Sequence, residues 1–337
     1  MNAVNVDVPQ YGQLCQLAPD LYWARFTLPF RLNHINLYML DTDDGWCLID
    51  AGVNDEDTAR HWQQLLTGPL SHQPVCRLVI THHHVDHIGY AGELARRFSI
   101  PMEMTAAETE HAQWLYGLSD PDYQQIAAEH YQHFGVEEEH IQAVATSTSR
   151  FRRLAAPFAP ITLLKAGDSI QSTHGLWHIR TDRGHSDEHI SLTDTDRQLM
   201  IGGDFLLPRI SPNISADIRD RDEDLLSAYF TYLEEMQHLS DEMKVFPGHD
   251  WPFTHAGMRA AELIDHHHQR LEQLCTAARH TDITTSDAID ILFGRRFGDH
   301  ELYFASGEAR AHLNYLVAHH RMEKTELSGQ PDRFRLI

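Results

Sequence analysis

Four histidines and one aspartate lie within nine residues of this chain, in the stretch T-H-H-H-V-D-H-I-G over residues 81–89. In extended backbone, side chains at positions i and i+2 point the same way, so His82 and His84 can reach one metal ion. Asp86 and His87 follow on a turn and can bind a second ion beside the first. Imidazole together with carboxylate suits zinc, and also iron or manganese. The stretch therefore predicts a metal site.

The elements before this stretch place it at the end of a core strand. VCRLVI (75–80) is a short apolar run, which is typical of a buried strand. Strand ends are where layered α/β folds bind ligands. Upstream we expect two strands and a helix, over 34–40, 46–50 and 54–67, with Asn54 or Asp55 as the helix cap.

Further side chains that can bind metal follow later strand-like segments. His185 lies between two expected strands, Asp204 ends LMIGGD after a glycine pair, and His249 ends VFPGH. Asp50 ends an earlier strand, CLID, in the same way. Because each residue lies at the end of a core strand, we expect all of them to converge on one edge of a sheet sandwich.

The order H-x-H-x-D-H, G-H, G-D and P-G-H, preceded by L-I-D-A-G, resembles the metallo-β-lactamase superfamily, and most of all its glyoxalase II-like branch. The resemblance covers roughly residues 20–255. It implies an α/β protein with the αββα sandwich of that fold and a centre of two divalent metal ions, taken as Zn²⁺ with iron or manganese as alternatives.

The resemblance also implies a role for each motif residue. The first metal would be held by His82, His84 and His185, and the second by Asp86, His87 and His249, with Asp204 bridging the two. Asp50 would orient ligands without binding metal. His189 matches the second histidine of the family's G-H-x-x-G-H stretch, but here Glu188 stands where the family usually has a small residue.

The implied chemistry is hydrolysis. Two cations close together would lower the pKa of a bridging water, so that hydroxide attacks an ester, thioester, lactone or lactam carbonyl. One metal would stabilise the oxyanion. Asp86 would accept the water's proton and pass it to the leaving group, which makes Asp86 the candidate catalytic residue.

The chain is long enough for more than one domain. With 337 residues, it is expected to form a catalytic domain over 1–255 with a helical insertion at about 106–158, and a connecting helix over 256–281. The segment 282–337 reads as two short helices and a β-hairpin. Its T-S-D-A-I-D-I-L-F and A-R-A-H-L-N-Y-L patterns resemble the winged-helix-like extension of some longer superfamily hydrolases, including an endoribonuclease branch.

Composition narrows the function classes. Lys and Arg number 27 against 49 Asp and Glu, a net charge of −22, which argues against a general nucleic-acid partner. The four cysteines form no C-x-x-C pair, and the N-terminal residues lack a secretory pattern, so we expect a cytoplasmic protein without membrane association. The insertion and the C-terminal segment offer surfaces for a homodimer.

These observations favour a small-molecule thioesterase or esterase, acting on an acyl-CoA or a glutathione thioester. The alternatives are a phosphodiesterase or ribonuclease, a lactonase or lactamase, and a regulatory binding protein that keeps the fold without turnover.

Some side chains outside the motifs are weaker candidates. Tyr116 belongs to an aromatic helical segment that either covers an apolar substrate or forms core. Arg209, with Arg219 and Arg221, would pair with an anionic group of the substrate or with nearby acids. The run His266–His268 cannot chelate one ion, because three consecutive helix positions face three directions, and it reads as helix surface.

Overall fold

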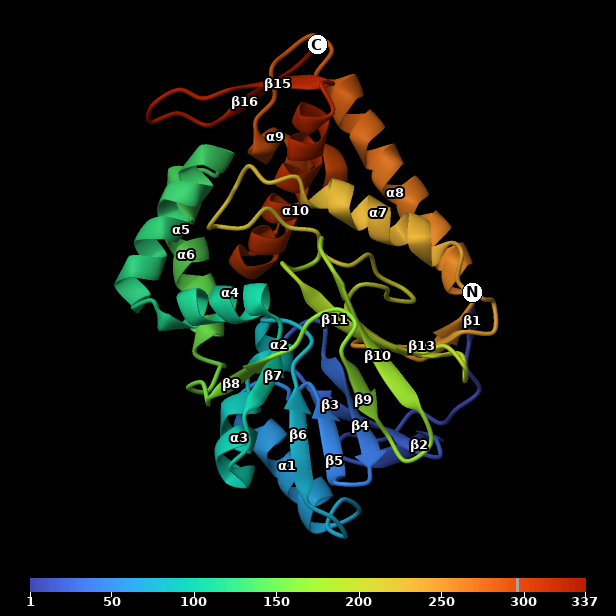
Figure 1. Ribbon diagram of the computed structural model, residues 1–337. Helices are drawn as coiled ribbons and strands as arrows, with labels where there is room; N and C mark the ends of the chain where they lie inside the picture. The colour runs from blue at the N-terminus through green and yellow to red at the C-terminus, as the bar shows by residue number, and fades with distance from the viewer. Residues whose placement is uncertain (295–296) are drawn as a thin grey trace. The chain divides into compact units, whose positions relative to one another are not determined.

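The computed structural model describes residues 1–294 and 297–337, which form two compact units. The first unit comprises residues 1–117, 152–212 and 236–259, and the second comprises 118–151, 213–235 and 260–337. The two units interleave along the chain, so neither is one continuous stretch. Figure 1 labels the helices and strands that make up the units.

Two sheets of seven strands each form the centre of the first unit (Figure 1). The first sheet has the order β2-β3-β4-β5-β6-β7-β8, with strands Leu14–Ala18, Leu21–Thr27, His34–Thr42, Gly45–Ile49, Val75–Val79, Met102–Met104 and Ile161–Leu163. The second has the order β1-β14-β13-β12-β11-β10-β9, with strands Asn2–Ala3, Phe253–Thr254, Lys244–Pro247, Leu199–Gly203, His189–Asp194, Leu176–Asp182 and Ser169–Gln171. The strands expected over 34–40, 46–50 and 75–80 correspond to β4, β5 and β6.

The two sheets share one apolar core. Alternate residues of the first sheet, such as Trp23 and Leu40, pack in one cluster with Trp177 and Phe246 of the second. Because successive strand residues point to opposite faces, the other face of the first sheet is also apolar, and it packs against helix residues such as Trp62. This architecture confirms the predicted α/β sandwich class.

The helices of the first unit are short, and their start points lie at capping residues or soon after strands. They are α1 (Glu56–Thr67), α2 (Val85–Ile88), α3 (Ala91–Phe98) and α4 (Ala106–Gly117). Asp55 is the N-cap of α1, where its carboxylate accepts the Thr58 N–H at 2.8 Å, so of the two predicted caps Asp55 is confirmed. The predicted turn at Asp86 and His87 is the single helical turn α2.

The second unit is mainly helical. Its helices are α5 (Asp120–Phe134), α6 (Glu138–Arg152), α7 (Leu225–Met236), α8 (Ala256–Ala277), α9 (Thr285–Phe293) and α10 (Asp299–Ala318), where α6, α7 and α8 each end or begin in the first unit. The predicted hairpin is present as β15 (Met322–Thr325) paired antiparallel with β16 (Arg333–Leu336). A capping box at Thr284 and Asp287 fixes the start of α9. Assignment of this region as a winged helix stays a prediction.

Among the described residues, no helix combines the length and the apolar character that crossing a bilayer requires.

Candidate metal centre

The predicted metal-binding residues all follow or connect strands of the first unit. Asp50 comes directly after β5, the 82–87 stretch comes after β6, and His185 lies in the loop between β10 and β11. Asp204 comes directly after β12, and His249 lies two residues after β13. Since β5 and β6 are parallel, and β12 and β13 are parallel, their carboxyl ends lie at the same edge of each sheet.

One group of donors consists of three imidazoles. Nε2 of His82 and Nδ1 of His84 are 2.9 Å apart. The ring of His185 has its centroid 4.6 Å from that of His84, and the three residues have nitrogens within 4.8 Å of one another. The structure therefore brings together the three residues expected to bind the first metal.

A second group lies beside the first. Nε2 of His249 is 3.3 Å from Oδ2 of Asp86 and 3.1 Å from Oδ2 of Asp204. Nε2 of His87 is 3.4 Å from the same Asp204 oxygen, and Nε2 of His185 is 3.7 Å from it. Asp204 thus lies between the two groups, in the position expected of a bridging carboxylate.

Two imidazoles of the second group are oriented by hydrogen bonds at their other ring nitrogen, Nδ1. Nδ1 of His87 donates to Oδ2 of Asp50 at 2.7 Å, and Nδ1 of His249 donates to the backbone carbonyl of His34 at 2.8 Å. A proton on Nδ1 leaves the Nε2 lone pair free to bind a metal. Asp50 itself is fixed by the backbone N–H of Thr81 at 2.8 Å, so its contacts match the orienting role expected for it.

His189 has a different role from the donors. Its side chain is buried, and its Nε2 accepts the backbone N–H of Asp204 at 3.2 Å. Gly203 has a φ of 50°, and a Cβ there would lie 2.3 Å from Nε2 of His189. The glycine therefore lets the imidazole approach the backbone and fix Asp204.

The protonation states of the two groups differ. Burial and the neighbouring imidazoles hold the pKa of His82 and His84 well below its ordinary value, so both are neutral. Burial would also lower the pKa of His249, but the carboxylates of Asp204 and Asp86 outweigh it and raise that pKa to about 10. The second group therefore favours positive charge, from protons or from a metal cation.

Donor atoms in this centre also lack ordinary partners. Within residues 1–294 and 297–337, neither Nε2 of His87 nor Oδ1 of Asp204 has a hydrogen-bond partner, although both atoms are buried. Leaving such atoms unpaired is costly. Neutral imidazoles and ionised carboxylates are the ligands that Zn²⁺ and similar ions prefer, so these residues fit divalent metal.

His83, between two donors, points away from them. Its Nδ1 donates to the buried carboxylate of Glu108 at 2.6 Å. Burial raises the pKa of Glu108, but His83 and backbone donors lower it more, so the carboxyl is ionised. Sequence reasoning missed Glu108, because it lies 25 residues from His83, on helix α4, and no local pattern marks it.

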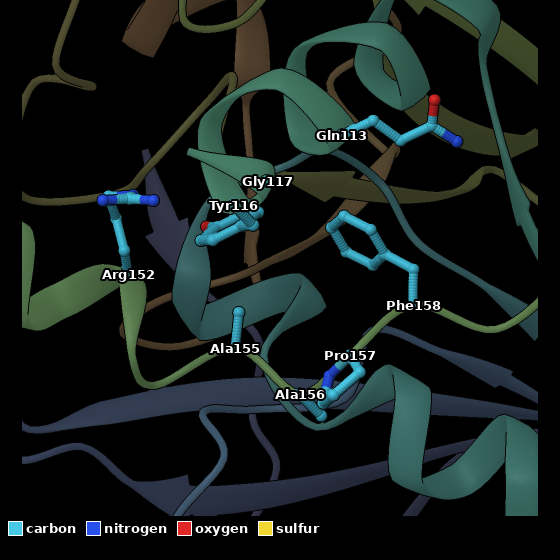
Figure 2. Close-up of a pocket in the computed structure, with 8 residues that line it drawn as sticks. All are labelled: Gln113, Tyr116, Gly117, Arg152, Ala155, Ala156, Pro157 and Phe158. Atoms are coloured by element: carbon cyan, nitrogen blue, oxygen red, sulfur yellow. The ribbon is translucent and has the colours of Figure 1, made fainter. Parts of the chain in front are cut away.

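A small cavity lies beside this loop. It has a volume of about 300 Å³, and its walls include Tyr116, Phe158, Arg152 and residues 155–157. In Figure 2 the rings of Tyr116 and Phe158 lie beside one another above the 155–157 segment, with centroids 5.8 Å apart. The Tyr116 hydroxyl donates to the His83 carbonyl at 2.9 Å, so a single aromatic ring connects the cavity wall to the loop of donors.

The arginine candidates have local partners. Arg209 is exposed, and its guanidinium lies 5.4 Å from the ring centroid of Trp251. Arg219 pairs with Asp217 at 3.2 Å. Arg221 lies 3.7 Å from Asp332, a buried carboxylate. Of the open alternatives, pairing with nearby acids is therefore the one observed for Arg219 and Arg221.

The expectation of a surface run at His266–His268 is wrong for His267, which is fully buried. Its Nδ1 lies 3.0 Å from Nε2 of His312, whose Nδ1 donates to the backbone carbonyl of Glu308. These residues have donor atoms within 4.8 Å of one another, but the Glu308 carboxylate is paired with Arg270. The Arg270 guanidinium thus balances the Glu308 carboxylate without a metal ion.

Comparison with known proteins agrees with the sandwich fold. Residues 31–249 match the family model described as the metallo-beta-lactamase superfamily, and residues 271–337 match that of a metallo-beta-lactamase-like C-terminal domain. The fold and donors define the class of metal-dependent hydrolases. The chain belongs to the metallo-beta-lactamase superfamily.

Several relatives match over nearly their whole length. A probable metallo-hydrolase, YqjP of Bacillus subtilis (strain 168), is 26% identical over 306 residues, which cover 89% of this chain and 92% of that protein. A beta-lactamase domain protein from Burkholderia ambifaria superposes with a TM-score of 0.92 at 28% identity, covering 100% of this chain and 98% of that one. A metallo-beta-lactamase family protein from Thermus thermophilus has the same fold, with a TM-score of 0.80 at 22% identity over 96% of this chain and 100% of that one.

Proposed function

We propose that this protein is a binuclear metal-dependent hydrolase that cleaves a thioester or ester of a small molecule, of the acyl-CoA or glutathione thioester type. The observation that carries the proposal is the position of Asp204, whose Oδ2 lies 3.1 Å from His249, 3.4 Å from His87 and 3.7 Å from His185. One carboxylate can therefore serve both groups of donors. The residues that would hold two ions, zinc in the first place, are His82, His84, His185, Asp86, His87, His249 and Asp204.

The chemistry divides between the metals and the chain. Divalent ions, when bound, supply Lewis acidity, which activates water and polarises a carbonyl. Asp86 is the candidate base, because its side chain is 17% exposed whereas that of Asp204 is 8% exposed. A carboxylate open to solvent can take the proton of the attacking water and return it to the thiolate or alkoxide that leaves.

We assign substrate binding to the cavity whose wall residue Tyr116 contacts the His83 carbonyl. Its aromatic and small apolar walls suit the apolar part of an acyl group, and about 300 Å³ is at the lower end of ligand-pocket volumes. Tyr116 would contact that group through its ring while its hydroxyl holds His83. Arg209, exposed beside Trp251, is a second candidate contact for an anionic part of the substrate.

Charge favours a small substrate over a polynucleotide. A net charge of −22 repels polyphosphate, whereas a small thioester needs only local contacts. The cysteines Cys15, Cys47, Cys76 and Cys275 are free thiols, which fits the reducing compartment where acyl-CoA and glutathione conjugates occur.

The test combines metal content with a hydrolysis screen. Purified protein is assayed for bound metal and for cleavage of thioesters, lactones, phosphodiesters and RNA, alongside Asp86→Asn and the exposed control Asp43→Asn. We expect about two metals per chain and thioester turnover that Asp86→Asn abolishes and Asp43→Asn leaves unchanged. Turnover of phosphodiesters or RNA alone would replace the proposal with a nuclease, and no metal with no turnover would refute it.

A further inference from the structure

Helix α4 contacts both loops that carry metal-binding residues. The carboxylate of Glu108 receives hydrogen bonds on both oxygens. Oε2 accepts the backbone N–H of His83 at 2.9 Å and its Nδ1–H at 2.6 Å. Oε1 accepts the backbone N–H of Glu188 at 2.8 Å. One buried side chain thus joins the loop after β6 to the loop between β10 and β11.

Other side chains of the same segment repeat this connection. The Thr105 hydroxyl donates to the backbone carbonyl of Glu188 at 2.9 Å. The ring of His111 stacks on that of His83 with centroids 3.7 Å apart, while its Nδ1 is 3.1 Å from Oδ2 of Asp187. Both backbone polar groups of Glu188 are therefore held by residues 105–108.

We infer that α4 is a brace that sets the distance between the two loops, and that Glu108 is its main positioning residue. The inference rests on the proposed function, in which His82 and His84 on one loop and His185 on the other bind the same metal. Three ligands whose separation is fixed in advance bind an ion more tightly than ligands that must first be ordered, and residues that support metal ligands change metal affinity by about 10–100-fold. Glu108 touches no ligand atom and acts through the two loops.

The support reaches Glu188 from two neighbouring positions. Glu108 of α4 accepts the Glu188 backbone N–H, and Thr105, the residue before α4, donates to its carbonyl. Thr105 and Glu108 thus hold this loop from a distant part of the chain.

The test compares Glu108→Gln with Glu110→Gln, an exposed neighbour on the same helix. A glutamine must turn its NH₂ toward either His83 or Glu188. It therefore keeps the hydrogen bonds to one loop and loses those to the other. Zn²⁺ affinity is measured by competition with a chelator, and backbone protection at 185–190 by hydrogen exchange. We expect Zn²⁺ to bind 10–100-fold more weakly to Glu108→Gln, with faster exchange of the Glu188 amide, and Glu110→Gln to match wild type.

Thr105→Val keeps the side-chain shape. It removes the bond that the hydroxyl donates to the Glu188 carbonyl and the 3.4 Å bond that the hydroxyl accepts from the Glu108 backbone N–H. The variant serves where Glu108→Gln does not fold, and we expect a smaller loss in the same direction. Wild-type Zn²⁺ affinity and wild-type Glu188 exchange in both variants would overturn the brace. If wild type itself binds no Zn²⁺, the proposed function fails, and the exchange of the Glu188 amide alone then decides whether α4 holds the loop.

Discussion

Nδ1 of His87 lies 2.7 Å from Oδ2 of Asp50, and the Asp50 backbone is held in the left-handed region, with a φ of 63°. Aspartate adopts this conformation more readily than most residues because its short polar side chain bonds nearby groups. Here that side chain also accepts the N–H and hydroxyl of Thr81. The end of β5 is thereby shaped to orient one imidazole of the metal centre.

Replacing Asp50 by asparagine should weaken metal binding. The amide can still accept from Thr81 N–H, but its NH₂ would face Nδ1 of His87 and favour the tautomer with the proton on Nε2. Metal affinity should fall by about 10–100-fold, measured by chelator competition. The control is Asp55→Asn, because asparagine caps helices as well as aspartate does. Equal affinity in Asp50→Asn and wild type would show that Asp50 does not set the tautomer.

Gly203→Ala should destabilise the protein and disturb Asp204. The residue has a φ of 50°, and the added Cβ would lie 2.3 Å from Nε2 of His189. Gly167→Ala is the matched control, since Gly167 has a φ of 87° and an added Cβ there would have no atom of the described residues within 4 Å. Both should lose about 1 kcal/mol of unfolding free energy from backbone strain. The unfolding free energy of each variant is measured by urea unfolding. We expect Gly203→Ala to lose more than Gly167→Ala and to bind less metal, and the difference measures the cost of the His189 clash. Equal losses in the two variants would refute this role of Gly203.

The second unit should lose stability in acid because of buried neutral histidines. Burial lowers the pKa of His312 and of His130 from 6.5 to about 3. These histidines therefore become protonated below pH 6.5 in the unfolded chain, but only near pH 3 in the folded chain. The stabilisation is complete above pH 6.5 and is lost as pH falls through that window, at most on the order of 5 kcal/mol per histidine.

His312→Gln tests this dependence. The variant should be less stable than wild type at pH 7.5, but its unfolding free energy should change less between pH 6.5 and 4. His280→Gln, at an exposed position, should follow the wild-type curve. The measurement is urea unfolding at a series of pH values, and parallel curves for His312→Gln and wild type would contradict the assignment.

Arg310 should be among the costliest positions to truncate. Its buried guanidinium bonds Asp332 and Asp222 at 2.6 Å each. It also lies 5.2 Å from the ring centroid of Phe134 and 4.9 Å from that of Phe334. Arg310→Leu leaves the buried Asp332 carboxylate without its closest cation, at an expected cost of about 3–5 kcal/mol.

The exposed pair of Arg60 with Asp57 gives the control for Arg310. Arg60→Leu should change unfolding free energy by less than about 1 kcal/mol. Both variants are compared by thermal and urea unfolding. Similar small losses of unfolding free energy in the two variants would mean that the other neighbours of Asp332 stabilise its carboxylate without Arg310.

The strands, their polar ends and the types of donor residue could be predicted from the sequence. Apolar runs such as 75–80 and 244–247 define buried strands, because side-chain alternation and burial are local properties. The cap at Asp55 is local in the same sense. His82 follows the last residue of β6 by three positions, so it lies near the sheet edge where that strand ends. The candidate site could therefore be located from the sequence.

The side chains that support the site and the histidines that are buried could not be predicted in this way, because both depend on tertiary packing. Glu108 reaches Glu188 across 80 residues, and His267 meets His312 across 45, so no local pattern could pair them. Helix periodicity says which positions share a face, but not what that face packs against. The packing partner is set by a long-range contact. Such a contact buries His267, which was expected at the surface, and joins Glu108 to the loop of Glu188.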